Sequence, residues 1–335
     1  MNEPLHPLAL GEILDRTAQM YRAHFLRFLG IAVIPAAVLL AFLAAVVGVV
    51  ATIKAVAGNK PLSDAQGITL GAIALVLGLV ALPLCVGAMA LCWAALTDAT
   101  ATTFLGGTFT IRGAYRSVWR RRWRLLWLLT MEALFLGVIP GSIIFATAIL
   151  NAVLTALADK KGLGALGVLG AVLTVVVIAA LLGGALWLLL RLCMAFAACV
   201  VEQVSAWQAL KRSGELSKGT KGRLFVLFLL GYALNTGLSM LVTVLLLVVV
   251  ALVPALQGQK NADKVGTVLL VALYGTYFLV KTLLTPLYGI ALTLFYFDQR
   301  IRKEGFDIER MMQYAGMVSA SAAVEQPAPA GGSGS

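Results

Sequence analysis

Histidine and cysteine are scarce in this sequence of 335 residues, with two and four copies. His6 and His24 lie near the N-terminus without a cluster of other ligand residues, so the sequence supports no metal site and no cofactor. The cysteines lie in apolar segments and form no C-x-x-C motif, which is typical of packing residues. No serine or cysteine accompanies histidine and carboxylate in the manner of a nucleophilic enzyme. We therefore expect a protein without enzymatic activity.

Charge is also scarce, at 12% of the residues against 61% hydrophobic residues. A soluble domain does not need so large an apolar share. The formal net charge of +11 could suggest a nucleic-acid partner, but such a protein carries its lysines and arginines on a polar domain. The polar segments here are too short for a domain. We therefore expect neither a nucleic-acid partner nor a soluble catalytic domain in this sequence.

Long apolar runs take up most of the chain. Each run exceeds the roughly 20 residues that a helix needs to cross a bilayer. Backbone groups in hydrocarbon must bond within their own segment, which favours helices. The sequence therefore predicts an all-α fold, a polytopic transmembrane helical bundle. Its six spans are expected at about 25–53, 67–96, 123–158, 163–201, 224–256 and 265–297.

Basic residues are distributed unevenly between the two sides of these spans, with a bias of about three to one. The positive-inside tendency places the richer side in the cytoplasm, and with it both termini of a bacterial inner-membrane protein. Acidic and basic residues interrupt the first 24 residues, so we do not expect a cleaved signal peptide. The richer side comprises residues 16–27, 112–124, 211–223 and 300–310, and the poorer side 54–60, 160–161 and 260–264.

The third run contains a possible turn at Pro140 and Gly141. A re-entrant turn there would make two short spans and would put the two most basic loops on opposite faces. One span over 123–158, kinked at Pro140, preserves the charge bias, since proline is tolerated in membrane helices. We expect the kink and keep the turn as the alternative.

The chain also shows a repeat of about one hundred residues. Residues 14–17, 114–117 and 210–213 share the pattern apolar, any, Arg, Ser or Thr, and each lies in a short amphipathic segment before an odd-numbered span. The even-numbered spans end near an acidic residue: Asp98, Glu202 and Asp298. The pattern predicts three hairpins, each preceded by a cytoplasmic amphipathic helix lying in the headgroup plane. The alternative is that basic linkers recur in any multispan protein.

These features predict three regions. Residues 1–24 form an N-terminal interfacial helix, 25–313 the six-span membrane domain, and 314–335 a disordered tail rich in small residues, proline and glycine.

The stretch "YRSVWRRRWRLLWLL" at 115–129 combines arginine and tryptophan at the start of a span. Tryptophan rings favour the headgroup level and guanidinium groups favour lipid phosphate. We expect membrane lipids, anionic ones above all, as partners at this side, or an unidentified protein. The expected contact residues are Arg16, Arg116, Arg120, Arg121, Arg122, Arg212 and Arg223.

Three ionisable residues lie within the predicted spans: Glu132, Arg191 and Lys281. A charge left in hydrocarbon costs about 3 kcal/mol or more. Glu132 and Arg191 have overlapping depths by helical rise, so we predict an ion pair between the third and fourth spans. It would act either as a clamp that fixes the register of the bundle or as a solute or proton site. Lys281 is expected to extend toward the outer surface.

Three stretches resemble a known family. They are the G-E-I-L-D-R opening at 11–16, the S-x-E-L-x-K-G linker at 213–219 and the closing Y-x-D-x-R-I-R-x-E-G-F-D at 296–307. They resemble the bacterial family named glycerophosphoryl diester phosphodiesterase membrane domain. The resemblance implies the membrane portion alone, without the catalytic barrel of the phosphodiesterases. It also suggests a cytoplasmic polar layer in which Asp98, Glu202 and Asp298 pair with neighbouring arginines.

The sequence thus favours a non-catalytic membrane protein whose basic cytoplasmic face engages anionic lipids or a partner protein, as a scaffold or accessory subunit. The alternative is a transporter or lipid-translocating protein with a polar cavity lined by Glu132, Arg191 and Lys281.

Overall fold

The computed structural model describes residues 6–57, 64–161, 164–257, 262–306, 308 and 312, and the tail expected at 314–335 lies outside this part. The described residues form helices and no strand. In chain order the elements are α1 (Leu10–Ala23), α2 (Phe25–Ala57), α3 (Asp64–Phe104), α4 (Ile111–Trp119), α5 (Arg122–Ala133), the π-helical turn η1 (Leu134–Val138), α6 (Ile139–Lys161), α7 (Gly164–Leu192), α8 (Ala195–Val201), α9 (Ala206–Leu216), α10 (Lys221–Gln257) and α11 (Ala262–Glu304).

Six helical segments of the described chain are long and apolar enough to cross a membrane, which confirms the predicted all-α polytopic bundle. Their outward side chains are apolar: Phe145 on α6 is 69% exposed and Val175 on α7 is 67% exposed. Such faces suit lipid, because extended apolar surface in water is unfavourable. The chain is a multi-pass membrane protein.

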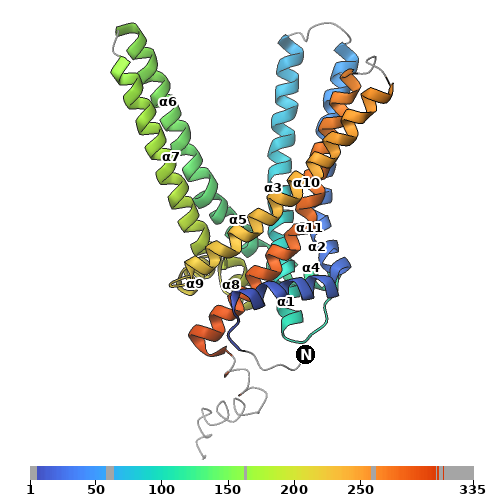
Figure 1. The fold of residues 1–335 in the computed structure, drawn as a ribbon, viewed down its shortest axis with the longest axis vertical. Helices are drawn as coiled ribbons and strands as arrows, with labels where there is room; N and C mark the ends of the chain where they lie inside the picture. The colour runs from blue at the N-terminus through green and yellow to red at the C-terminus, as the bar shows by residue number, and fades with distance from the viewer. Residues whose placement is uncertain are drawn as a thin grey trace, which may run out of the picture.

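The six segments form three hairpins that meet at one end, and the α6–α7 hairpin diverges from the other two toward the opposite end (Figure 1). We call the meeting end the basic end; it consists of α1, α4, α8, α9 and the adjoining ends of the long helices. The α10–α11 hairpin crosses in front of α2 and α3 in this view, while α6 and α7 lean away from both (Figure 1). In α11, half of the residues in the most apolar stretch are buried inside the protein. In the span Gly167–Val201, none of the residues in the most apolar stretch is buried. Helix α11 is therefore the central helix.

The core of the described chain lies at the basic end. Phe297 of α11 stacks on Phe104 at the end of α3, with ring centroids 4.9 Å apart, and also contacts Phe306 at 5.8 Å. The Tyr21 hydroxyl of α1 donates to the carbonyl of Leu283 on α11 at 2.8 Å. The hairpins are therefore held together at the basic end by apolar packing.

The third span is continuous. The π-helical turn η1 precedes Pro140 and joins α5 to α6 within one span, so the alternative of a re-entrant turn is wrong. Proline lacks the N–H that would bond to the preceding turn, and a wider turn before it accommodates its ring and the orphaned carbonyl.

The fourth span departs from the prediction of one helix over 163–201, because α7 ends at Leu192 and α8 begins at Ala195. Ser213 of α9 fills the break. Its hydroxyl donates to the carbonyl of Arg191 at 2.7 Å and accepts from the N–H of Met194 at 3.2 Å. A side chain from another helix thus satisfies backbone groups that the break leaves open.

The three predicted amphipathic helices are present as α1, α4 and α9. Their apolar faces pack on the protein and not solely on a headgroup layer. Ile13 and Thr17 of α1 are buried, and α1 contacts α11. In α9, Ala209 and Ser213 are fully buried. These helices are part of the bundle, since their apolar stripes complete its core.

Candidate functional site

The three acidic residues at the ends of the even-numbered spans all lie at the basic end. Asp298 of α11 is fully buried. Its carboxylate accepts from the Leu8 N–H at 2.8 Å, from Arg302 Nε at 2.9 Å and from Arg223 at 3.1 Å. Both arginines also donate to the Leu8 carbonyl, at 2.8 and 2.9 Å. This network fixes the segment before α1 to the ends of α10 and α11.

Glu202 lies at the end of α8 and pairs with Arg212 of α9, whose Nε is 3.0 Å from both carboxylate oxygens. The Tyr296 hydroxyl donates to the same carboxylate at 2.7 Å, and Arg300 lies 3.8 Å away. Glu304 joins the network through Arg212 and Arg300. Burial lowers the pKa of Arg212, but its bonds to the two carboxylates outweigh this and raise the pKa, so the guanidinium stays charged.

Asp98 of α3 accepts a hydrogen bond of 2.8 Å from the Ser117 hydroxyl of α4. Arg121 lines the same small polar cavity, of about 210 Å³. Above it, Tyr115 donates to the Ile31 carbonyl of α2 at 2.8 Å, and burial raises the pKa of this phenol, which keeps it a neutral donor. The link from Asp98 to α4 is thus a hydrogen bond to a hydroxyl, beside an arginine.

Each acidic residue contacts the amphipathic segment of the next unit. Asp98 of the first hairpin binds α4, Glu202 of the second binds α9, and Asp298 of the third binds the segment leading into α1. The three repeats therefore close into a ring at the basic end, which the linear sequence pattern did not predict.

The ring changes the interpretation of two predicted lipid-contact residues. Arg212 and Arg223 are both engaged by carboxylates, with side chains 28% and 30% exposed. Guanidinium groups that already form ion pairs with carboxylates are less available to bind a lipid phosphate. Both side chains therefore have a structural role in the ring, and their contact with lipid stays a prediction.

Four of the other predicted contact residues, Arg116, Arg120, Arg121 and Arg122, lie on or beside α4 and α5, and the fifth, Arg16, lies on α1. Arg116 and Arg120 are exposed, and the Arg122 guanidinium lies over the rings of Trp119 and Trp123, 5.3 and 5.8 Å from their centroids. We call these five residues the Trp–Arg cluster. Arg121 donates to the Val200 carbonyl at 3.4 Å, and Arg16 is half-buried on α1, so both lie apart from the cluster.

The structure does not bring the three intramembrane charges together. Glu132 lines a cavity between the hairpins, Arg191 lines a different one beside Trp207, and Lys281 lines neither. In the described chain no ion pair joins Glu132 to Arg191, so that prediction is wrong. Arg191 instead lies 5.2 Å from the ring of Trp187.

Lys281 is exposed on α11, with Nζ 5.5 Å from the ring centroid of Tyr277, one turn nearer the divergent end. Its side chain therefore extends in the predicted direction. Neither of these two cavities is lined by all three charges, and the transport alternative stays a prediction.

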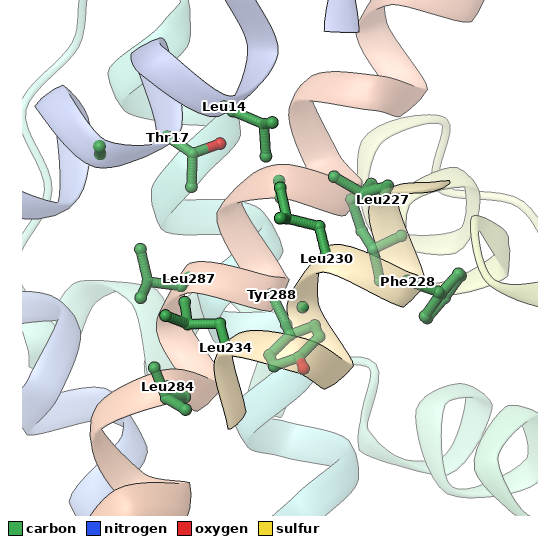
Figure 2. A pocket seen from close by; sticks show the side chains of 13 residues that line it. Leu14, Thr17, Leu227, Phe228, Leu230, Leu234, Leu284, Leu287 and Tyr288 are labelled. Carbon is green, nitrogen blue, oxygen red and sulfur yellow. The ribbon is translucent and has the colours of Figure 1, made fainter. Parts of the chain in front are cut away.

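An apolar pocket of about 190 Å³ lies between α1, α10 and α11. Leu14 and Thr17 of α1 stand opposite Leu230 of α10 and Leu287 of α11, with the Tyr288 ring between the long helices (Figure 2). Because the Thr17 hydroxyl donates to the Ile13 carbonyl at 2.7 Å, the lining presents almost no polar chemistry. The pocket is a packing feature of the α1 contact.

Sequence reasoning missed Tyr296 and Ser213 as organising residues. Ser213 carried a usable signal, because it occupies the repeated Ser or Thr position, as Ser117 does. Tyr296 begins the closing motif at 296–307, but nothing in that motif indicated its hydrogen bond to Glu202, 94 residues away. Among the described residues no cluster of histidine, cysteine and carboxylates could hold a metal ion.

No protein-family model, curated protein or solved structure matches the chain, so the family resemblance of the three motifs stays a prediction and the site has to be interpreted from its own geometry.

Proposed function

We propose that this membrane protein binds anionic phospholipid at the Trp–Arg cluster and acts as a non-catalytic scaffold or accessory protein. The observation that carries the proposal is the exposure of the cluster: Trp119 and Trp123 are 54% and 74% exposed at the start of a membrane span. In this proposal the basic end faces the cytoplasm of a bacterial inner membrane, as the positive-inside tendency favours.

The geometry suits a headgroup. The Arg122 guanidinium lies over two indole rings, so it is oriented before a ligand arrives. The paired guanidinium nitrogens match the geometry of a phosphate. Trp127, 57% exposed one turn farther into the span, extends the surface toward the hydrocarbon. A phospholipid would place its phosphate at the arginines and its chains along α5.

The test is lipid retention by a triple variant, Arg116→Gln, Arg120→Gln and Arg122→Gln. Each basic residue near an anionic surface contributes about 1 kcal/mol, so the loss is about 3 kcal/mol, or roughly 100-fold in affinity. Phosphatidylglycerol bound to the detergent-purified protein is counted by native mass spectrometry, against phosphatidylcholine as the uncharged reference.

The matched control removes three exposed charges elsewhere at the basic end, in the variant Arg22→Gln, Lys211→Gln and Lys218→Gln. Both variants lower the net charge equally. Loss of lipid retention in the cluster variant, with retention kept in the control variant, supports lipid binding at the Trp–Arg cluster. If both variants lost retention equally, net charge, and not this arrangement, would attract the lipid. If neither variant lost retention, the proposal would be wrong.

A further inference from the structure

The cavity that Glu132 lines is at the point where the three hairpins converge. Its lining comes from α3, α5, α7, α8, α10 and α11, so every hairpin contributes. Its volume is about 220 Å³. One water needs about 10–15 Å³ on this measure, so the space is larger than a structural water requires.

Glu132 has no hydrogen bond or ion pair with the other described residues. A carboxylate in an apolar surrounding is costly unless it is neutralised by a proton or by a cation. Helix α5 could have carried an apolar residue here without this cost. An unpaired carboxylate beside an open space is therefore a candidate for binding a positively charged group.

The other polar side chains of the lining offer acceptors. The Thr97 hydroxyl donates to the Trp93 carbonyl at 2.9 Å and the Thr293 hydroxyl to the Gly289 carbonyl at 2.7 Å. Since each hydroxyl has one hydrogen, which is already donated, both can act only as hydrogen-bond acceptors toward a ligand. The Cys193 thiol likewise donates to the Leu190 carbonyl, at 3.5 Å.

The only side-chain donor left among these lining residues is the Trp93 indole N–H, and none of them is lysine, arginine or histidine. The lining suits a ligand that donates hydrogen bonds and carries positive charge. An anion would meet the Glu132 carboxylate without a compensating cation, so this chemistry excludes phosphate from the cavity.

Aromatic rings complete the lining. Trp93, Phe196 and Phe228 come from three different helices, α3, α8 and α10. A ring face attracts a cation, and a set of rings with one carboxylate is a typical arrangement for organic ammonium groups. A small inorganic cation would need several more oxygen ligands than this largely apolar lining supplies.

We propose that the cavity binds an organic ammonium group, with Glu132 as its counter-ion and Trp93, Phe196 and Phe228 as the rings that surround it. The group belongs either to a small free amine or to the headgroup of a lipid that enters between the hairpins. This site is separate from the Trp–Arg cluster and takes the opposite charge.

The test measures binding of radiolabelled ethanolamine and choline to the full chain in nanodiscs of phosphatidylglycerol. The variant Glu132→Gln keeps the shape of the side chain and removes its charge. For ethanolamine, loss of one charge-assisted hydrogen bond from its ammonium group predicts binding about 10- to 100-fold weaker. For choline, whose nitrogen carries no hydrogen, the variant removes the charge attraction alone, and binding should also weaken. Because the change removes a charge from the membrane, the variant is expected to insert and fold at least as well as the original chain.

The matched control is Glu215→Gln, an exposed carboxylate on α9 outside the cavity, which should leave binding unchanged. Equal binding by the original chain and Glu132→Gln overturns the proposal. So does displacement of the labelled amine by sodium ion at equal concentration, since that outcome indicates a simple cation site.

A second arm separates the two sources of the amine. Nanodiscs containing phosphatidylethanolamine should weaken binding of the free probes if the lipid headgroup occupies the cavity, and native mass spectrometry should then show phosphatidylethanolamine retained by the original chain and lost by Glu132→Gln. Unchanged probe affinity indicates a free amine. If no probe binds and phosphatidylethanolamine is not retained, the proposal is wrong.

Discussion

Asp298 provides the most direct test of how the basic end is held together. The substitution Asp298→Asn keeps the size of the side chain and removes its charge. The carboxylate accepts from two neutral donors, Leu8 N–H and Gln299 Nε2, and from two guanidinium groups, Arg302 at 2.9 Å and Arg223 at 3.1 Å. The amide can retain a neutral bond, but it cannot balance both guanidinium groups.

The expected magnitude comes from the two charged bonds. Hydrogen bonds to charged groups contribute about 1.5–3 kcal/mol and neutral ones about 1 kcal/mol, so losing the charge of Asp298 weakens the two bonds by about 1–4 kcal/mol in total. The side chains of Arg223 and Arg302 are 30% and 38% exposed, so water recovers part of this. We expect a loss of about 2 kcal/mol in the free energy of unfolding.

Two measurements check the value. Unfolding in mixed micelles gives the global loss, and hydrogen exchange reports the Leu8 amide, which donates to Asp298 at 2.8 Å. A loss of about 2 kcal/mol corresponds to exchange roughly 30-fold faster there. The control is Asp15→Asn on α1, an exposed carboxylate bonded to Gln19 at 2.7 Å, which should change stability by less than about 0.5 kcal/mol. Unchanged exchange at Leu8 in Asp298→Asn would refute the anchoring of this segment.

The remaining predictions concern the second network and the α10–α11 contact. Glu202→Gln should lower the free energy of unfolding by about 1–3 kcal/mol, and a double-mutant cycle with Arg212→Gln should show coupling; additive losses would contradict the pairing. Gly231→Ala should lower it by about 1–3 kcal/mol, because the added Cβ would lie 2.8 Å from Tyr288 Cζ, whereas Gly237→Ala on the same helix meets no atom within 4 Å and should cause no loss. Equal effects of the two alanines would rule out the close approach.

The long helices and the amphipathic segments could be predicted because their signals are local. An apolar run of 30 residues, or an apolar stripe such as Leu10, Ile13 and Thr17, depends on neighbours in sequence. The continuity of the third span through Pro140 followed from local chemistry in the same way. The break at Cys193 did not, because what stabilises it is Ser213 on another helix.

The arginines show the limit of charge patterning. Arg122 and Arg223 both precede apolar runs, and the sequence gives no reason to treat them differently. Arg223 is nevertheless paired with Asp298, 75 residues away, whereas Arg122 lies over two exposed indole rings. The two arginines differ because of the tertiary structure, which places the end of α11 opposite Arg223 and no carboxylate of the described chain opposite Arg122.

The wrong ion pair has a related cause. Depth along a helix can be estimated from rise per residue, but an ion pair also requires that the two side chains face each other around the helix axes. Arg191 lies in the last turn of α7, against Gly214 of α9, and Glu132 faces the cavity with Cys193 and Phe196. Equal depth therefore did not imply contact.

Helix α5 carries Arg122 of the Trp–Arg cluster and the cavity carboxylate Glu132, ten residues apart, which is about 15 Å along a helix. The phosphate and amine of an ethanolamine headgroup are separated by only two carbon atoms, so one headgroup cannot reach both sites. A lipid bound at the cluster must also approach an exposed surface, whereas the cavity is lined by helices of all three hairpins. The two proposals therefore stand independently: Glu132→Gln bears on the cavity alone, and the arginine variants bear on the cluster alone. If either substitution abolished both kinds of binding, the explanation would have to be a change in how the three hairpins meet at the basic end.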